Sequence, residues 1–318
     1  MLVIYCSEQL DGIAAAAILY RYAQLKNAKI KLGGFLDYAQ TDQTLNEMEK
    51  LQGDLLFILD FSPEQISDLD NKLKQISAKN KIAYWNCHHP YDEQTISTMM
   101  KYVHSLDFSG TQKNTSKKEE RLCSAEMTCH KFLPNDSVAT TLATLAHDIE
   151  FWIRQNENAL KLTDLIQSGF DKKELIRVLS RGVFWSDSFE KIRQDYLEKK
   201  TKALNDLMKT LSIKKYVNTH FGFVLSPTII TSADAGQKML DSHSSIDVAV
   251  VLFRNGKISF RRREGLDLDL SKIAQLFDGG GHPYASGGKI TEFKSISLEN
   301  IEKIHFLIDR RLKNLFLG

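Results

Sequence analysis

The sequence has no apolar run long enough to cross a membrane. The longest apolar stretch near its start, IAAAAIL at residues 13–19, falls far short of the roughly 18 residues that a spanning helix needs. The first residues, MLVIYC, also lack the positively charged segment that opens a secretory signal. We therefore expect a cytoplasmic protein without membrane contact.

The number of cysteines and the net charge are low as well. The four cysteines, Cys6, Cys87, Cys123 and Cys129, form no CxxC pair and are too few for a disulfide framework, so we expect free thiols. A net charge of +2 is too small to indicate a nucleic-acid binder by itself, so any anion site must be local. Apolar residues at 42% and charged residues at 26% are typical of a globular chain and exclude disorder.

Short apolar runs alternate with helical patterns in the first half of the chain. The runs at 2–6, 55–60 and 81–86 read as buried strands, and residues 11–25 and 62–76 read as helices. This order predicts a parallel sheet covered by helices on both faces. Polar residues follow each strand, at the carboxyl edge where such sheets bind ligands: Ser7 to Asp11, Asp60, and Cys87 to His89.

The chain length and a change of texture predict two domains. Residues 186–211 contain no Gly or Pro and read as a long helix, and after it strand-like runs flank an RNG turn at 254–256. We predict an α/β domain over 1–190, a connecting helix over 191–212 and a smaller α/β domain over 213–318. The polar stretch 105–122 reads as a surface loop.

A group of acidic and histidine residues could bind a metal ion. Asp11, Asp60, His88 or His89, and Asp148 offer carboxylate and imidazole ligands, which suit manganese, magnesium or zinc. An isolated Asp at a strand end is more often a turn or cap residue, and a lone His is usually structural. The spacing alone therefore gives a weak indication of a metal site.

The segment FDGGGHPYASGG, residues 277–288, is more specific. Its glycines let the backbone approach a ligand closely and present N–H groups to an anion, and His282 could add a donor. The alternative is a flexible loop, which would not need the ordered small residues that follow.

These motifs together resemble the DHH phosphoesterase superfamily. GGGHPYASGG resembles the glycine signature of the DHH-associated domain, and CHHP after a strand resembles the motif that names the superfamily. LDGIAAAAI, ILDFS and LAHDIEFW resemble its other motifs, in the same order. The family includes RecJ-type exonucleases, nanoRNases, cyclic-dinucleotide phosphodiesterases and pyrophosphatases, and the pyrophosphatases have a different C-terminal domain.

The resemblance implies one complete set of metal ligands and one degraded set. The complete set is Asp11, Asp60, His88 and Asp148. In the other set, Ser7 and Gln9 stand where the family has His and Asp, so only the shared Asp60 remains. Cys87 also replaces the Asp of the third motif, a carboxylate that the resemblance places outside both ligand sets. The resemblance thus leaves one ion or none, with Mn²⁺ expected first and Mg²⁺ or Zn²⁺ as alternatives. A shifted alignment would instead offer Cys6 and Glu8, with Cys87 nearby, as a thiolate site for zinc.

The resemblance also implies roles toward substrate. Asp60 and His89 would be catalytic, with His89 on the scissile phosphate. The residues implied to bind substrate are Arg261, Gly279, Gly280, Gly281 and His282.

Two functions follow from these assignments. The first is a metal-dependent phosphodiesterase, exonuclease-like or nanoRNase-like, that acts on single-stranded DNA or RNA, short oligonucleotides or dinucleotides with an impaired first metal site. The second is a catalytically inactive nucleic-acid-binding protein or replisome scaffold, with replication or repair proteins as partners.

Overall fold

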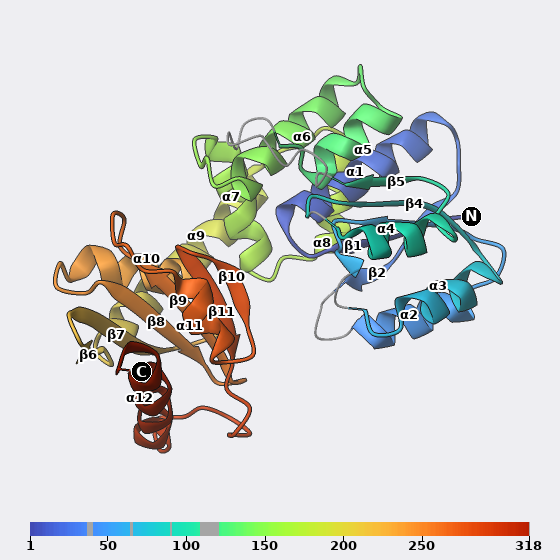
Figure 1. Cartoon of the computed structure of the whole chain (residues 1–318). Helices are drawn as coiled ribbons and strands as arrows, with labels where there is room; N and C mark the ends of the chain where they lie inside the picture. Colours follow the sequence, from blue (N-terminus) through green and yellow to red (C-terminus); the bar gives the residue numbers. More distant parts are fainter. Residues whose placement is uncertain (37–40, 64–65, 90, 109–120, 318) are drawn as a thin grey trace. The chain divides into compact units, whose positions relative to one another are not determined.

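The computed structural model describes residues 1–36, 41–63, 66–89, 91–108 and 121–317, and the chain divides into two units, Met1–Gln194 and Asp195–Gly318 (Figure 1). Helix α9, Asp187–Met208, runs across the division between them. Each unit has its own sheet and its own buried core. Among the described helices, none combines the length and apolar character needed to cross a bilayer.

The first unit is built on a parallel sheet of five strands in the order β2-β1-β3-β4-β5. The strands are β1 Leu2–Ser7, β2 Ile30–Leu36, β3 Leu55–Leu59, β4 Lys81–Cys87 and β5 Leu106–Phe108. Because successive side chains of a strand point to opposite faces, Val3 and Tyr5 of β1 pack in one core while Ile4 and Cys6 pack in the other.

Helices cover both faces of this sheet (Figure 1). One core receives side chains from α1 Leu10–Leu25, α5 Ser124–Phe132, α6 Ser137–Glu150, α7 Glu157–Gln167 and α8 Lys172–Ser180. The other receives them from α2 Thr41–Lys50, α3 Leu69–Ser77 and α4 Glu93–Met100. Helix α1 is buried at every position from Leu10 to Leu19, which explains its run of alanines: small side chains let neighbouring helices approach on several sides.

The second unit has a mixed sheet of six strands in the order β10-β11-β9-β8-β7-β6, in which β7 and β8 pair in parallel. Its strands are β6 Ser212–Tyr216, β7 Thr219–Ser226, β8 Val248–Phe253, β9 Lys257–Arg262, β10 Gly280–His282 and β11 Ala285–Lys289. Its helices are α10 Ser232–Ser242, α11 Leu270–Gln275 and α12 Ile301–Leu317. The predicted fold class is confirmed: a helix-covered parallel sheet, a connecting helix and a second α/β part.

Some local predictions were wrong. Helix α3 begins at Leu69 rather than at Ser62, and residues 106–108 of the predicted loop 105–122 form β5. Residues 109–120 of that loop lie outside the described residues. The RNG turn does join β8 to β9, and Gly256 there has a φ of +86°, which glycine adopts without strain.

Candidate metal centre

Three predicted ligands meet at the carboxyl edge of the first sheet. Asp11 lies in the first turn of α1, just after β1, while Asp60 directly follows β3 and His88 directly follows β4. One ligand atom from each lies within 4.8 Å of the others. The topology produces this meeting, because β1, β3 and β4 are adjacent parallel strands that end at one edge.

The spacing of the ligand atoms suits one divalent ion. His88 Nδ1 lies 3.0 Å from Asp60 Oδ1 and 3.5 Å from Asp11 Oδ2. Neighbouring ligands of an octahedral ion, each at ~2.1 Å from it, stand about 3.0 Å apart. His88 Nε2, on the opposite side of the ring, lies 3.0 Å from Oε1 of Glu150, the last residue of α6.

Helix α5 holds both carboxylates in place. The backbone N–H groups of Ser124 and Ala125 donate to the two oxygens of Asp11 at 2.8 and 2.7 Å. These N–H groups belong to the first turn of α5, where the helix dipole favours a negative charge. The Ser124 hydroxyl also donates to Asp60 Oδ1, at 3.2 Å.

Asn86 fixes the backbone of Asp60. Its Oδ1 accepts the Asp60 N–H at 3.0 Å, and its Nδ2 donates to the Ser124 carbonyl and to Thr128 Oγ1, each at 2.9 Å. Asp60 has a φ of +54°, in the left-handed region that Asp and Asn tolerate best among side-chain-bearing residues. A fully buried amide thus determines where the Asp60 carboxylate points.

The three ligands perturb one another's ionisation. Burial, reinforced by the charge of Asp60, raises the pKa of Asp11 to about 6. Burial alone would raise the pKa of Asp60, but hydrogen bonds from His88, Ser7 and Ser124 hold it below its usual value. Burial alone would lower the pKa of His88, yet its carboxylate neighbours hold that pKa far above its ordinary range. Without an ion, a protonated His88 therefore supplies the positive charge that the carboxylates need.

A second ion does not fit the residues at the degraded positions. The Ser7 hydroxyl donates to Asp60 Oδ2 at 2.5 Å, so it acts as a hydrogen-bond donor there and not as a ligand. Gln9 is exposed and makes no cap to α1. A Cβ on Gly12 would collide with Ser7, so glycine at this position lets α1 start directly against the end of β1.

The cysteines do not form the alternative thiolate site. Burial raises the pKa of the Cys87 thiol to about 11. Cys87, His88 and His89 offer ligand atoms within 4.8 Å of one another. Cys6, however, is fully buried in the apolar core beside α1, and Glu8 is exposed and pairs with Lys172 at 3.0 Å. Cys6 and Glu8 thus have no common site with Cys87 among the described residues.

Asp148 is buried but does not belong to the three-residue cluster. Its Oδ1 accepts the backbone N–H groups of Gln155 and Asn156 at 2.9 and 3.1 Å. Its Oδ2 is also buried, and no described group donates a hydrogen bond to it. A buried carboxylate oxygen without a partner is expected where an ion or water completes the site. The assignment of Asp148 as a metal ligand stays a prediction.

Two further residues complete this part of the unit. His89 is exposed and packs against His88 with ring centres 4.2 Å apart and ring planes tilted by 39°, which leaves it accessible to a phosphate group. Glu150, which contacts His88, was not predicted. The sequence carries only a weak signal for it, namely that it lies two residues after Asp148 in LAHDIEFW.

In the second unit, Arg261 lies on β9 and His282 on β10, the two strands that flank β11. His282 pairs with Ala285 across β10 and β11, and Ala285 pairs with Arg261 across β11 and β9. The imidazole of His282 is exposed and stacks on Tyr284 with the ring planes nearly parallel, at 5°.

The glycines of the GGGH segment have a structural role as well. A Cβ on Gly279 would collide with the carbonyl of Gly287, and Gly281 has a φ of +134°. Gly280, between them, has open space where a Cβ would be. Close approach of β10 to β11 thus explains two of the three consecutive glycines.

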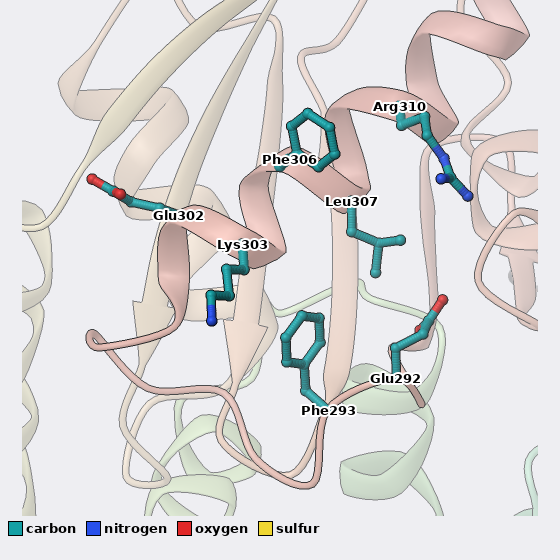
Figure 2. A pocket seen from close by; sticks show the side chains of 7 residues that line it. All are labelled: Glu292, Phe293, Glu302, Lys303, Phe306, Leu307 and Arg310. Carbon is teal, nitrogen blue, oxygen red and sulfur yellow. The ribbon is translucent and has the colours of Figure 1, made fainter.

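A pocket of about 460 Å³ also lies in the second unit, beside α12 (Figure 2). It is lined by Glu292, Phe293, Glu302, Lys303, Phe306, Leu307 and Arg310. None of the predicted site residues lines it, so we treat it as separate from the candidate metal centre.

The fold and the cluster together define an α/β protein with a candidate metal site at the carboxyl edge of a parallel sheet. Residues 221–314 match the DHHA1 domain family. The chain has the fold of the DHH superfamily with a DHHA1 C-terminal domain. No curated protein matches its sequence.

Three solved structures are similar to the chain over 98% of its length. RecJ in complex with Mn²⁺ from Thermus thermophilus has a TM-score of 0.62 at 10% identity, and the match covers 52% of that chain. The pGpG-specific phosphodiesterase PggH from Vibrio cholerae has a TM-score of 0.51 at 9% identity, with 98% of that chain covered. CDC45 from Entamoeba histolytica has a TM-score of 0.52 at 10% identity, with 95% covered. The chain thus spans about half the length of the RecJ structure.

Proposed function

We propose that this protein is a metal-dependent phosphodiesterase that uses a single ion and acts on short single-stranded nucleic acid or on dinucleotides. The observation that carries the proposal is the cluster of Asp11, Asp60 and His88, whose ligand atoms lie within 4.8 Å of one another. The similarity to a pGpG-specific phosphodiesterase and to a Mn²⁺ complex of RecJ supports the reaction class and favours Mn²⁺, with Mg²⁺ or Zn²⁺ as alternatives.

In this proposal, Asp11, Asp60 and His88, whose Nδ1 faces both carboxylates, would hold the ion. A bound ion would polarise the phosphate and lower the pKa of a bound water. Ion binding would release the Nδ1 proton of His88 to solvent, and its Nε2–H would donate to Glu150, whose Oε1 lies 3.0 Å away. Exposed His89 contacts the phosphate of the substrate. In the second unit, Arg261 and His282 bind a nucleotide phosphate or base through their cationic and donor groups, beside the backbone of Gly279–Gly281.

A second function has its own support. The residues expected to hold another ion are replaced by Ser7, which donates a hydrogen bond to Asp60, and by the exposed Gln9. These replacements favour a protein that binds nucleic acid without cutting it, as a scaffold for replication or repair proteins.

Metal analysis and a turnover assay on the wild-type chain separate the two functions. We expect one Mn²⁺ per chain by isothermal titration, and cleavage of end-labelled RNA and DNA of two to five nucleotides that depends on added Mn²⁺, Mg²⁺ or Zn²⁺. Binding of the oligonucleotides without cleavage under every metal would support the scaffold and refute the enzyme. Absence of both binding and cleavage would refute both functions.

The contact between Glu150 and His88 gives a prediction about metal affinity. Metal-binding histidines usually donate their other ring N–H to a carboxylate, which fixes the tautomer, and losing that carboxylate typically weakens metal binding by roughly 10- to 100-fold. We expect Glu150→Gln to raise the dissociation constant for Mn²⁺ by about that factor. Isothermal titration and the electron paramagnetic resonance signal of free Mn²⁺ would measure the change.

Glu157→Gln is the matched control for this experiment. It makes the same chemical change seven residues away, at a side chain that is 79% exposed and pairs with Lys161. Its Mn²⁺ affinity should equal that of the wild type. Equal affinity in both variants would show that Glu150 does not orient His88 for metal binding.

A further inference from the structure

The loop that follows α6 is held by hydrogen bonds to Asp148. We call residues 151–156, which join α6 to α7 in Figure 1, the Asp148 loop. The N–H groups of Ile153 and Arg154 donate to the backbone carbonyl of Asp148 at 2.9 and 3.1 Å. The next two, of Gln155 and Asn156, donate to its carboxylate oxygen Oδ1. Four consecutive N–H groups thus converge on one residue and determine the path of the loop.

Two large side chains occupy left-handed backbone positions in this loop. Trp152 has a φ of +60° and Arg154 a φ of +58°. Glycine takes this conformation without strain, whereas a bulky side chain in it costs free energy, and such residues gather at functional sites. The loop therefore has Trp and Arg at two positions where the backbone conformation favours glycine.

The neighbours of Trp152 anchor the loop while Trp152 itself faces solvent. Phe151 is buried in the core beside α6, and Ile153 packs against the same core. Trp152 lies outside that core and is 51% exposed. The guanidinium carbon of Arg154 lies 4.4 Å from the centre of a Trp152 ring, so an aromatic surface and a positive charge are presented together.

The Asp148 loop begins beside the candidate metal centre. Glu150, which contacts His88 at 3.0 Å, precedes Trp152 by two residues. Two residues of chain span at most about 7 Å. The backbone of Trp152, with Arg154 packed on its ring, therefore lies within about 7 Å of the backbone of the residue that contacts His88.

We propose that Trp152 and Arg154 form a nucleotide-binding site, with a base of the single-stranded substrate stacked on Trp152 and a neighbouring phosphate bound by Arg154. Every base has a π face, so a single exposed indole binds bases without sequence preference, and an adjacent arginine binds the backbone. The proposal rests on the proposed function, because it takes nucleic acid as the ligand.

The test is binding of a labelled five-nucleotide single strand to the full chain without added metal, followed by fluorescence anisotropy. Trp152→Ala should weaken binding roughly tenfold, as expected for one lost base stack, and Trp152→Phe should restore most of the affinity because it keeps an aromatic face. Trp152 fluorescence should also be quenched on binding, and Trp152→Phe should remove that quench.

Arg154→Gln tests the charge separately. It should reduce the slope of log affinity against log salt by about 0.7, the value for one phosphate contact on a single strand. Met100→Ala is the control, because Met100 is an apolar side chain of the same unit that is 70% exposed and lies at the end of α4. It should change neither affinity nor slope. Circular dichroism would show that every variant is folded.

The outcomes distinguish this inference from the proposed function. If the wild type binds the strand and folded Trp152→Ala binds it equally well, the pair is a structural or protein-binding feature and the inference is wrong, while the proposed function stands. If the wild type neither binds nor cuts any oligonucleotide, the proposed function itself fails. A tenfold loss with Trp152→Ala that Trp152→Phe restores supports the site.

Discussion

Asp60→Asn should abolish metal-dependent cleavage and weaken Mn²⁺ binding by more than roughly a hundredfold, since even carboxylates that only orient a metal ligand cost up to that factor. Asp60 lies within hydrogen-bonding distance of His88 and also accepts from Ser7 and Ser124. It is the one carboxylate that every expected ion would share. Its replacement removes a negative charge from the centre of the cluster.

Asparagine is a sharper substitution here than alanine. Asp60 has a φ of +54°, and asparagine tolerates that conformation whereas alanine would add strain. The amide oxygen can still accept from the Ser124 hydroxyl, and the backbone N–H can still donate to Asn86. We therefore expect Asp60→Asn to fold like the wild type.

Thermal melting and metal titration of the same preparation would check this expectation. Cleavage that survives Asp60→Asn unchanged would come from a contaminating nuclease, and the enzyme proposal would fail. Loss of cleavage with an unchanged melting temperature would place the effect at the metal centre rather than in the fold.

The central strands of the first sheet could be predicted because their apolar runs are uninterrupted. β3 and β4 are buried along most of their length, as LLFIL and KIAYWNC indicate. β2 was missed because IKLGGFL contains a lysine and two glycines, and only Leu36 in it is buried. A strand at the edge of a sheet needs fewer apolar residues, so its sequence carries less signal.

In the candidate metal centre, too, the residues that follow buried strands could be predicted, and the others could not. Asp11 and Asp60 each follow a buried strand, and the rule for parallel sheets places such residues together. The sequence carries only a weak signal for Glu150, because it reaches His88 from the end of a helix, and that approach depends on how α6 packs against α1. The second use of Asp148, as acceptor for four N–H groups of the loop after α6, likewise depends on the loop conformation.

Restoring the degraded positions should add a second ion. The family resemblance puts His at position 7 and Asp at position 9, so Ser7→His combined with Gln9→Asp should raise the Mn²⁺ count from one to two per chain. Two ions can hold the attacking and leaving oxygens together, and we expect turnover on short oligonucleotides to rise roughly a hundredfold. Isothermal titration and the cleavage assay would measure both changes.

The local structure bears on both substitutions. Gly12, which lies directly against Ser7, adds no side chain of its own at this point. Gln9 is the N-cap of α1 and makes no capping hydrogen bond, and aspartate is among the residues favoured at that position. Removal of the Ser7 hydroxyl also frees Asp60 Oδ2, which it now occupies.

The control is a triple variant that combines Ser7→His and Gln9→Asp with Asp60→Asn. Because both ions need Asp60, this variant should bind neither ion tightly. A double variant that still binds one ion would show that positions 7 and 9 do not correspond to the family's ligands. A double variant that binds two ions without cutting any oligonucleotide would show that ion number does not limit the reaction, and would favour the scaffold function. Two ions with faster cleavage would mean that Ser7 and Gln9 are what limits the natural protein.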